Sequence, residues 1–338
     1  MRTYMIGAGA MGGVYGGLLF RAGFEVTLID PREDHIGKIQ RDGLTVDGVR
    51  GRHVVRVPAR NSHAGLPPAD LAIVFTDANA TRDAARTALQ VLKPDGFALT
   101  LQNGIGNVEA LIAELGQARV VAGVSMNSAA NPEPGRVLYT NVGVTSLGEL
   151  DGCTTPRIQE VSRMLNQAEI ETCIVPDPMA QIWGKFVLNC AINALTAVTG
   201  LRSGEMYRTP EVNALQDRVI DEILAVVGRK GIKLSEADPR KKIKDHCRVR
   251  YNKPSMMQHV EQGRRTEIDA LNGALVREAK ALGIPVPYNE TVVAVVKGLE
   301  KSRRLLLQEP PPDYAKLESQ ALAEQRAGQI PAGVSRGA

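Results

Sequence analysis

The pattern of apolar and polar positions divides the chain into two unlike halves. In the first half, short apolar runs alternate with amphipathic stretches of helical spacing, which predicts parallel strand–helix–strand units and an α/β fold. The runs expected to form strands are Thr3–Ile6, Glu25–Ile29, Leu71–Phe75, Ala98–Leu101 and Arg119–Val124.

From about Pro176 the pattern changes to long segments with apolar residues at helical spacing, and the second half is expected to be all-helical. The boundary is placed at the Pro176-Asp177-Pro178 sequence. The segments expected to be helical are Met179–Leu195, Glu211–Lys230 and Met256–Leu282.

The stretch before this boundary, residues 135–174, holds β-rich pieces at 136–139 and 143–146 and a helical piece over 156–167. We expect it to extend the first domain. The predicted organisation is therefore a first domain over residues 1–176, an all-helical domain over 177–308 and a tail over 309–338, with a short helix and a frayed terminus.

Composition narrows the function classes. The 338 residues are 43% apolar, and 41 Lys and Arg against 37 Asp and Glu leave a net charge of only +4. Disordered and fibrous classes are excluded, and this charge gives no reason to expect nucleic acid or a membrane surface as partner. The four cysteines have no metal-ligand or disulfide spacing, so we predict no metal site and a cytoplasmic location. Glycines throughout the apolar N-terminus argue against a signal or membrane helix, and none is predicted elsewhere.

A basic cluster lies within residues 229–265 and has only Tyr251 as an interleaved aromatic residue. Two interpretations stay open for it. The first is a solvated helix face, and the second is a site near an anionic cofactor or substrate.

A glycine-rich loop follows the first strand. Its sequence, Gly7-Ala8-Gly9-Ala10-Met11-Gly12, has the G-x-G-x-x-G spacing between a strand and a helix. In such a loop the first glycine makes the tight turn, the second admits a pyrophosphate and the third lets the helix pack on the strand. We therefore predict that a Rossmann-type domain binds a dinucleotide here, with all six residues in contact with it.

Asp30 ends the second strand, 18 residues after Gly12. A carboxylate here can accept hydrogen bonds from the adenosine ribose, which favours NADH over NADPH. It can also cap a helix that has Pro31 first and Glu33 third. Arg32 stands where it could neutralise a 2′-phosphate, so NADPH stays open as the alternative.

Three polar side chains share one face of an apolar predicted helix. Lys185, Asn189 and Asn193 are each four residues apart, so an ammonium and two amides point together. Such groups need polar partners in apolar surroundings, and a substrate could supply them. The alternative is that the two amides are structural and that the lysine extends its ammonium group to solvent.

Two further segments carry polar residues. Ser255 with Gln258 has the spacing of a helix capping box. Gln102-Asn103-Gly104 follows a predicted strand at its carboxyl end, where open α/β sheets bind ligands.

Taken together, these segments make the chain resemble the ketopantoate reductase (2-dehydropantoate 2-reductase) family, in the family's order from residue 1 to about residue 300. The glycine loop is shared with many dehydrogenases, whereas the lysine and asparagine helix combined with the serine-to-glutamate segment is specific. The matching pieces are Gly7–Gly12, Gln102-Asn103-Gly104, Trp183-Gly184-Lys185 with Asn189 and Asn193, and Pro254-Ser255-Met256 through Thr266-Glu267-Ile268-Asp269.

The resemblance implies hydride transfer from NADH or NADPH to a 2-oxo acid, with ketopantoate the expected substrate and pantoate the product. It makes Lys185 the general acid and Glu267 the residue that holds a substrate hydroxyl and orients the site. It places Asn103 beside the nicotinamide. The substrate-binding residues that it implies are Asn189, Asn193, Asn252 and Ser255.

The chain departs from the family's pattern at two positions near the site, and the first bears on the substrate. Asp77 stands where a lysine is common, which reverses a charge near the nicotinamide and substrate, and His259 stands where an aspartate is common. We interpret His259 as a surface or supporting residue. The alternatives kept open are a relative that reduces another bulky 2-oxo acid and a dinucleotide-binding sensor without turnover. The expected partner is a small-molecule 2-oxo acid, and a homodimer through the helical half is a further hypothesis.

Overall fold

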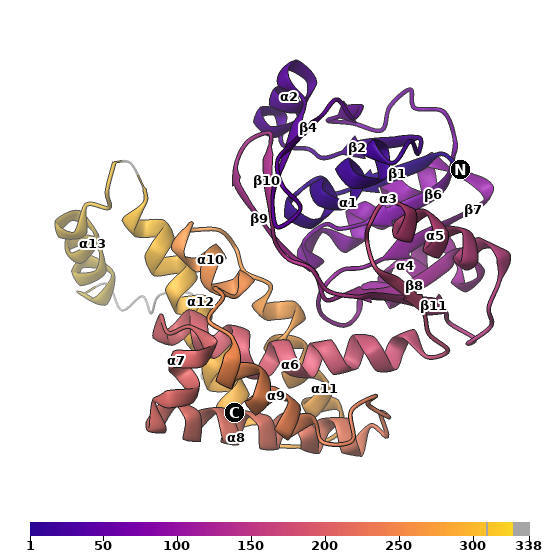
Figure 1. Cartoon of the computed structure of the whole chain (residues 1–338). Helices are drawn as coiled ribbons and strands as arrows, with labels where there is room; N and C mark the ends of the chain where they lie inside the picture. Colours follow the sequence, from indigo (N-terminus) through magenta and orange to yellow (C-terminus); the bar gives the residue numbers. More distant parts are fainter. Residues whose placement is uncertain (309, 327–338) are drawn as a thin grey trace.

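The first half folds around an eight-stranded sheet of order β12-β11-β8-β7-β6-β1-β2-β5 (Figure 1). Its central strands are parallel, because each apolar run is followed by a helix that returns the chain to the same edge. Only β11 runs antiparallel to its neighbour, β8. The strands are β1 (Thr3–Ile6), β2 (Val26–Ile29), β5 (Ala59–Arg60), β6 (Ala69–Val74), β7 (Leu92–Thr100), β8 (Val120–Ser125), β11 (Thr145–Glu149) and β12 (Thr172–Ile174).

Helices cover both faces of this sheet, and each face has its own apolar core. One core is built from β1, β2, α1, α2 and α5, and the other joins the opposite face to α3 and α4. The helices and single turns of this half are α1 (Ala10–Arg21), α2 (Glu33–Asp42), η1 (Ala78–Ala80), α3 (Thr81–Val91), α4 (Asn107–Leu115), η2 (Gln117–Arg119) and α5 (Pro156–Gln167).

A second sheet, of order β4-β3-β10-β9, packs on α1. A Cβ at Gly13 would lie 2.7 Å from Val137 and one at Gly17 would lie 2.8 Å from Val46, so the glycines of α1 make room for this sheet. The β-rich piece 136–139 was expected simply to extend the first domain, and the separate sheet was missed. Its strands are β3 (Leu44–Gly48), β4 (His53–Val55), β9 (Ser128–Glu133) and β10 (Arg136–Asn141).

The second half is a cluster of helices around α6. This helix is apolar and long enough to cross a membrane by composition alone, yet 67% of its most apolar stretch is buried inside the protein. It begins where the Asp177 carboxylate accepts a hydrogen bond from Ala180 N at 2.8 Å, with Pro178 in the first turn. The helices and turn are α6 (Pro178–Thr199), α7 (Ser203–Arg208), α8 (Pro210–Arg229), α9 (Pro239–Val249), α10 (Ser255–Glu261), η3 (Ile268–Ala270), α11 (Asn272–Ala281), α12 (Pro287–Leu306) and α13 (Tyr314–Arg326).

The predicted α/β fold with a helical second half is confirmed, and two expectations need comment. The segment 256–282 is not one helix: α10 ends at Glu261, and a loop and η3 separate it from α11. The structure describes residues 1–308 and 310–326. The short helix expected in the tail corresponds to α13. The frayed terminus was predicted for residues outside this description.

Candidate active site

The glycine-rich loop has the geometry that a dinucleotide requires. Gly7 has φ +93°, and a Cβ there would lie 2.7 Å from Thr76 N. A Cβ on Gly12 would lie 1.8 Å from the carbonyl oxygen of Gly7, so the helix packs directly on the turn. A Cβ on Gly9 would have Arg32 Nη2, 3.7 Å away, as its nearest neighbour, so the space over this residue is open. Because α1 has neither a capping side chain nor an acid in its first turn, its N–H groups suit a phosphate.

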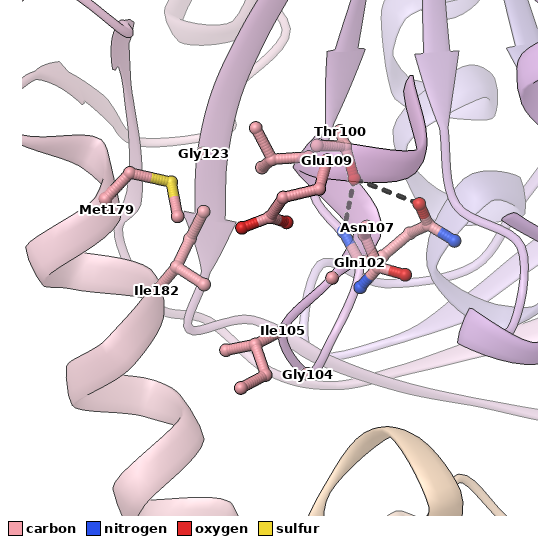
Figure 2. Close-up of a pocket in the computed structure, with 11 residues that line it drawn as sticks. Thr100, Gln102, Gly104, Ile105, Asn107, Glu109, Gly123, Met179 and Ile182 are labelled. Atoms are coloured by element: carbon pink, nitrogen blue, oxygen red, sulfur yellow. Dashed lines mark hydrogen bonds between the residues drawn. The ribbon is translucent and has the colours of Figure 1, made fainter. Parts of the chain in front are cut away.

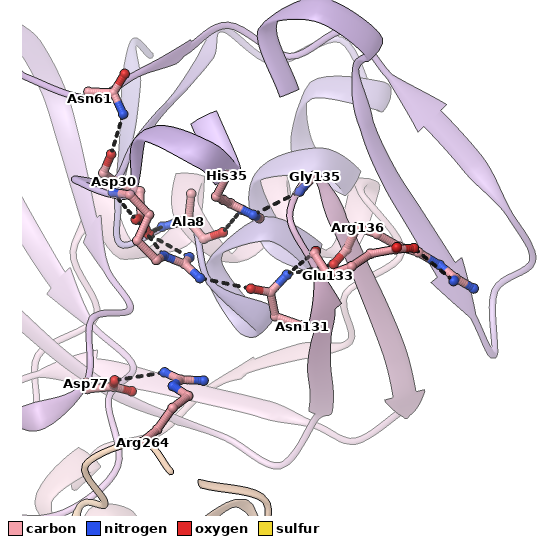
Figure 3. Close-up of polar contacts among 11 residues, drawn as sticks. Ala8, Asp30, His35, Asn61, Asp77, Asn131, Glu133, Gly135, Arg136 and Arg264 are labelled. Carbon is pink, nitrogen blue, oxygen red and sulfur yellow. Dashed lines mark hydrogen bonds and ion pairs between the residues drawn. The ribbon is translucent and has the colours of Figure 1, made fainter. Parts of the chain in front are cut away.

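The Asp30 carboxylate is fully engaged by protein donors (Figure 3). Oδ1 accepts from Arg32 N at 3.1 Å and Arg32 Nε at 2.9 Å, and Oδ2 accepts from Ala8 N at 2.9 Å and Arg32 Nη2 at 3.0 Å. Burial opposes ionisation of this carboxylate, but Arg32 outweighs it and lowers the pKa of Asp30. The four bonds use its four lone-pair positions, which leaves none for a ribose hydroxyl.

The helix cap predicted at Asp30 is wrong. Helix α2 begins at Glu33, and Arg32 occupies the N-cap position without a capping side chain. Of the two carboxylate oxygens, Oδ2 reaches back to Ala8 N in the glycine loop, and Oδ1 accepts from Arg32 N, which lies before the first residue of the helix.

Asn131 of β9 supports Arg32 and was missed from the sequence. Its Oδ1 accepts from Arg32 Nη1 at 2.9 Å, and its Nδ2 donates to Arg136 O at 2.7 Å (Figure 3). His35 joins the turn between β9 and β10 to the glycine loop. Its Nδ1 accepts from Gly135 N at 3.0 Å, and its Nε2 lies 2.9 Å from Ala8 O. No local motif marks these residues, since the contacts join positions about 100 residues apart in the chain.

Lys185, Asn189 and Asn193 lie along α6, as the spacing predicted. Lys185 Nζ donates to the carbonyl oxygen of Ser125, at the end of β8, at 2.6 Å. Burial lowers the pKa of Lys185 to about 8, and the negative charge of Glu267 opposes this shift. Asn193 is only 8% exposed and Asn189 is half-buried, so these amides need polar partners, which a ligand can supply.

Glu267 precedes η3 and reaches across to the sheet domain. Its Oε1 accepts from Ala78 N at 3.1 Å and its Oε2 accepts from Asn103 Nδ2 at 3.3 Å. Burial and the charge of Asp77 raise the pKa of Glu267, against the pull of these two donors and of Lys185. The structure thus brings Glu267 and Asn103 together and sets Glu267 within electrostatic range of Lys185.

Ser255 and Asn252 lie at the start of α10 and in the loop before it. The predicted capping box is wrong, because Ser255 is the first helical residue, Pro254 is the N-cap, and Gln258 Nε2 donates to Lys253 O at 2.8 Å. Ser255 is half-buried and Asn252 is exposed. Among the residues that the structure describes, the hydrogen-bond partners of Lys185 and Glu267 are Ser125, Ala78 and Asn103, and not Ser255 or Asn252.

Asp77 faces the helical domain, where Arg264 Nη2 lies 3.3 Å from its carboxylate (Figure 3). Asn79 Nδ2 also donates to Thr266 O at 3.1 Å, so this loop joins the two domains. Arg264 therefore compensates the charge that the sequence placed there. His259 is half-buried rather than on the surface, and burial and Arg264 lower its pKa.

A small hollow of about 10 Å³, room for about one water molecule, lies beside this site, between the ends of β7 and β8 and the start of α6. Figure 2 shows Glu109 pointing into it from α4, opposite Met179 and Ile182. None of the residues predicted to bind cofactor or substrate lines it. We therefore do not assign it to the substrate.

Two family models match the chain. Residues 3–152 match "Ketopantoate reductase PanE/ApbA", and residues 177–300 match "Ketopantoate reductase PanE/ApbA C terminal". A 2-dehydropantoate 2-reductase of Pyrococcus horikoshii is 33% identical over 300 residues, covering 89% of this chain and 98% of the relative. The enzyme of that name from Halobacterium salinarum is 30% identical over 88% of this chain and 98% of its own.

Solved structures agree with these relatives. A PanE/ApbA family ketopantoate reductase from Ralstonia eutropha superposes with a TM-score of 0.83 at 32% identity, covering 90% of this chain and 100% of its own. D-mandelate dehydrogenase with NADH and anilino(oxo)acetate gives a TM-score of 0.83 at 25% identity, over 90% of this chain and 99% of its own. This chain belongs to the ketopantoate reductase family.

Proposed function

We propose that this protein reduces 2-dehydropantoate to pantoate with a nicotinamide cofactor. The observation that carries the proposal is the pair formed by Lys185 on α6 and Glu267 before η3, set at the end of β8 and next to Asn103. A sensor without turnover would have no use for an ammonium whose pKa is held near neutrality. Incubation with ketopantoate and NADPH should yield pantoate and oxidised cofactor in equal amounts.

When bound, the cofactor supplies a hydride to the carbonyl carbon. Lys185 binds the carbonyl oxygen and donates a proton to it as negative charge develops there. Glu267 stabilises the ammonium form of Lys185 and accepts a hydrogen bond from a substrate hydroxyl. Asn103 holds the carboxylate of Glu267 in place. We assign Asn189, Asn193 and Ser255 to the rest of the substrate, and the exposed Asn252 to the outer edge of the substrate site.

The rate of reduction is expected to depend on pH in two directions. Above pH about 8 the reaction should slow, because Lys185 loses the proton that it must donate. The reaction should also slow at low pH, because Glu267 becomes protonated. This loss should begin at a higher pH than for an ordinary carboxyl group, because the pKa of Glu267 is raised. The profile of kcat/KM against pH measures both limbs. A rate that keeps rising well above pH 8 would remove the lysine from the proton transfer.

We further propose NADPH as the preferred cofactor, with Arg32 binding the 2′-phosphate. The sequence favoured NADH through Asp30, but that carboxylate is occupied by protein donors, whereas the Arg32 side chain is 39% exposed and lies above Gly9. Arg32→Ala should raise KM for NADPH by about tenfold or more, the scale of a charge-assisted phosphate contact, and change KM for NADH far less.

Arg136→Ala is the matched control for Arg32, because the Arg136 side chain is 40% exposed and pairs with Asp47 and Glu133 of the small sheet. It should leave both Michaelis constants within about threefold of the parent, as exposed ion pairs contribute little. If Arg32→Ala raises KM for NADPH and KM for NADH by the same factor, Arg32 only holds the glycine loop in place.

Asp77→Asn is expected to move the acidic limb of the pH profile to lower pH. Asp77 raises the pKa of Glu267, so removing its charge lowers the pH at which the glutamate is protonated. KM for ketopantoate should change by less than about threefold, because Arg264 already compensates the carboxylate. Asp83→Asn, whose side chain is 85% exposed on α3, is the control. An unmoved acidic limb would show that Asp77 does not act on Glu267.

A second substrate is favoured by one observation. The likeness to D-mandelate dehydrogenase solved with NADH and anilino(oxo)acetate is as close in TM-score as that to the ketopantoate reductase. A bulky aromatic 2-oxo acid is therefore the second candidate. The homodimer through the helical domain and the cytoplasmic location stay predictions.

A further inference from the structure

The ammonium of Lys185 has a fixed support at the end of β8. It donates to the carbonyl oxygen of Ser125 at 2.6 Å, and a carbonyl accepts a hydrogen bond without taking the proton. The position of that carbonyl therefore sets where the ammonium points its other two N–H groups. Any residue that fixes Ser125 also fixes the direction of proton delivery.

A buried network fixes Ser125. The hydroxyl of Tyr15 donates to Ser125 Oγ at 2.8 Å and lies 2.5 Å from Thr145 Oγ1. Asn127 donates to Ser125 Oγ from its backbone N at 3.1 Å and from Nδ2 at 3.0 Å. Tyr139 donates to Asn127 Oδ1, which also accepts from Gly143 N at 2.9 Å. All five side chains are at most 6% exposed.

Tyr15 connects this network to the cofactor end of the site. It lies on α1, which begins at the glycine-rich loop, and its ring packs on Phe75 with centroids 4.7 Å apart. Burial raises the pKa of Tyr15 to about 12, so its hydroxyl keeps its proton and stays a hydrogen-bond donor over the working pH range. The network is satisfied throughout by protein groups, as a rigid support requires.

We propose that Tyr15 and Asn127 are positioning residues for Lys185, which act by holding the Ser125 carbonyl that orients the lysine's ammonium. The inference rests on the proposed function for its kinetic consequence. It adds a role for residues that never contact the substrate, and it links the helix that begins at the phosphate-binding loop to the proton donor through one set of buried hydrogen bonds.

Tyr15→Phe tests the proposal against Tyr4→Phe. Tyr4 is 1% exposed and its hydroxyl donates to Pro67 O at 2.5 Å, so the control removes a hydrogen-bonded phenol hydroxyl from the same domain, away from the Ser125 network. Tyr15→Phe should lower kcat about tenfold while KM for NADPH stays within about threefold, because orientation is lost but the phosphate loop is intact. Tyr4→Phe should change neither.

The pH profile separates positioning from a merely structural role. If the Ser125 carbonyl is no longer held, the ammonium loses its acceptor and its pKa falls below about 8. The basic limb in Tyr15→Phe should therefore move to lower pH by about half a unit or more, the worth of one net hydrogen bond. The charged group that acts on this lysine is Glu267, which the substitution leaves in place. A structural role would lower the melting temperature and leave the limb where it is.

A second readout does not depend on turnover. The rate at which an amine-acetylating reagent modifies Lys185, followed against pH by peptide mass mapping, reports the pKa of the lysine directly. If no 2-oxo acid is reduced, the proposed function fails while this profile still tests the network. Should Tyr15→Phe fail to fold, Ser125→Ala removes only the hydroxyl that the network holds and should shift the profile likewise. Midpoints equal to those of Tyr4→Phe would overturn the proposal.

Discussion

Lys185→Ala is expected to lower kcat by two or more powers of ten, the scale of general acid catalysis. Alanine cannot donate a proton to the developing alkoxide, and water is a poor replacement because the lysine lies on a largely buried face of α6. KM for NADPH should stay near the parent value, since the residues proposed to bind the other end of the cofactor, the glycine loop and Arg32, are unchanged. Steady-state kinetics with ketopantoate measures both constants.

The control for this variant is Lys233→Ala, which removes an exposed lysine from the same domain. It should behave as the parent. Lys185→Arg keeps the positive charge but gives up the near-neutral pKa, so kcat should still fall steeply. Turnover within a few-fold of the parent in Lys185→Ala would exclude the lysine as the acid.

Glu267→Gln should lower kcat/KM by about a hundredfold, because several effects of the carboxylate are lost together. The lysine loses the negative charge that raises its pKa, so the basic limb should move to lower pH. The amide also places an N–H where Ala78 N and Asn103 Nδ2 both donate, so one of these contacts is lost. Kinetics across pH and a thermal melt separate the chemical loss from a loss of stability.

Glu278→Gln is a suitable comparison for Glu267, because Glu278 pairs with Lys230 on the surface of the same domain. It should leave kcat/KM unchanged. If Glu267→Gln melts at the same temperature as the parent and keeps its rate and its basic limb, the glutamate has neither of the roles assigned to it.

Much of the fold was predictable because its signals are local. Strand β1 has the predicted bounds, and α5 has the predicted bounds of 156–167. Its start is marked by Thr155, whose Oγ1 caps Ile158 N, and by Pro156 in the first turn. The lysine and asparagine face of α6 was also predictable, since helical spacing alone aligns those side chains.

The errors arise where tertiary contacts override local patterns. Asp30 has the spacing of a helix cap, but the N–H of Ala8 and the Arg32 guanidinium bind it instead. Periodicity over 256–282 did not reveal the loop that lets Glu267 reach Asn103. The Tyr15 network joins residues that are 110 and more positions apart, so no spacing in the sequence marks it.

The most direct test of the central claim is a comparison of kcat/KM for ketopantoate and for phenylglyoxylate, the 2-oxo acid related to mandelate, with NADPH and with NADH. We expect ketopantoate with NADPH to give the highest value, by about tenfold or more over the aromatic acid, the discrimination that a few methylene-sized contacts supply. A higher kcat/KM for phenylglyoxylate would make the protein a reductase of aromatic 2-oxo acids. The absence of turnover with both acids and both cofactors would contradict the proposed activity altogether.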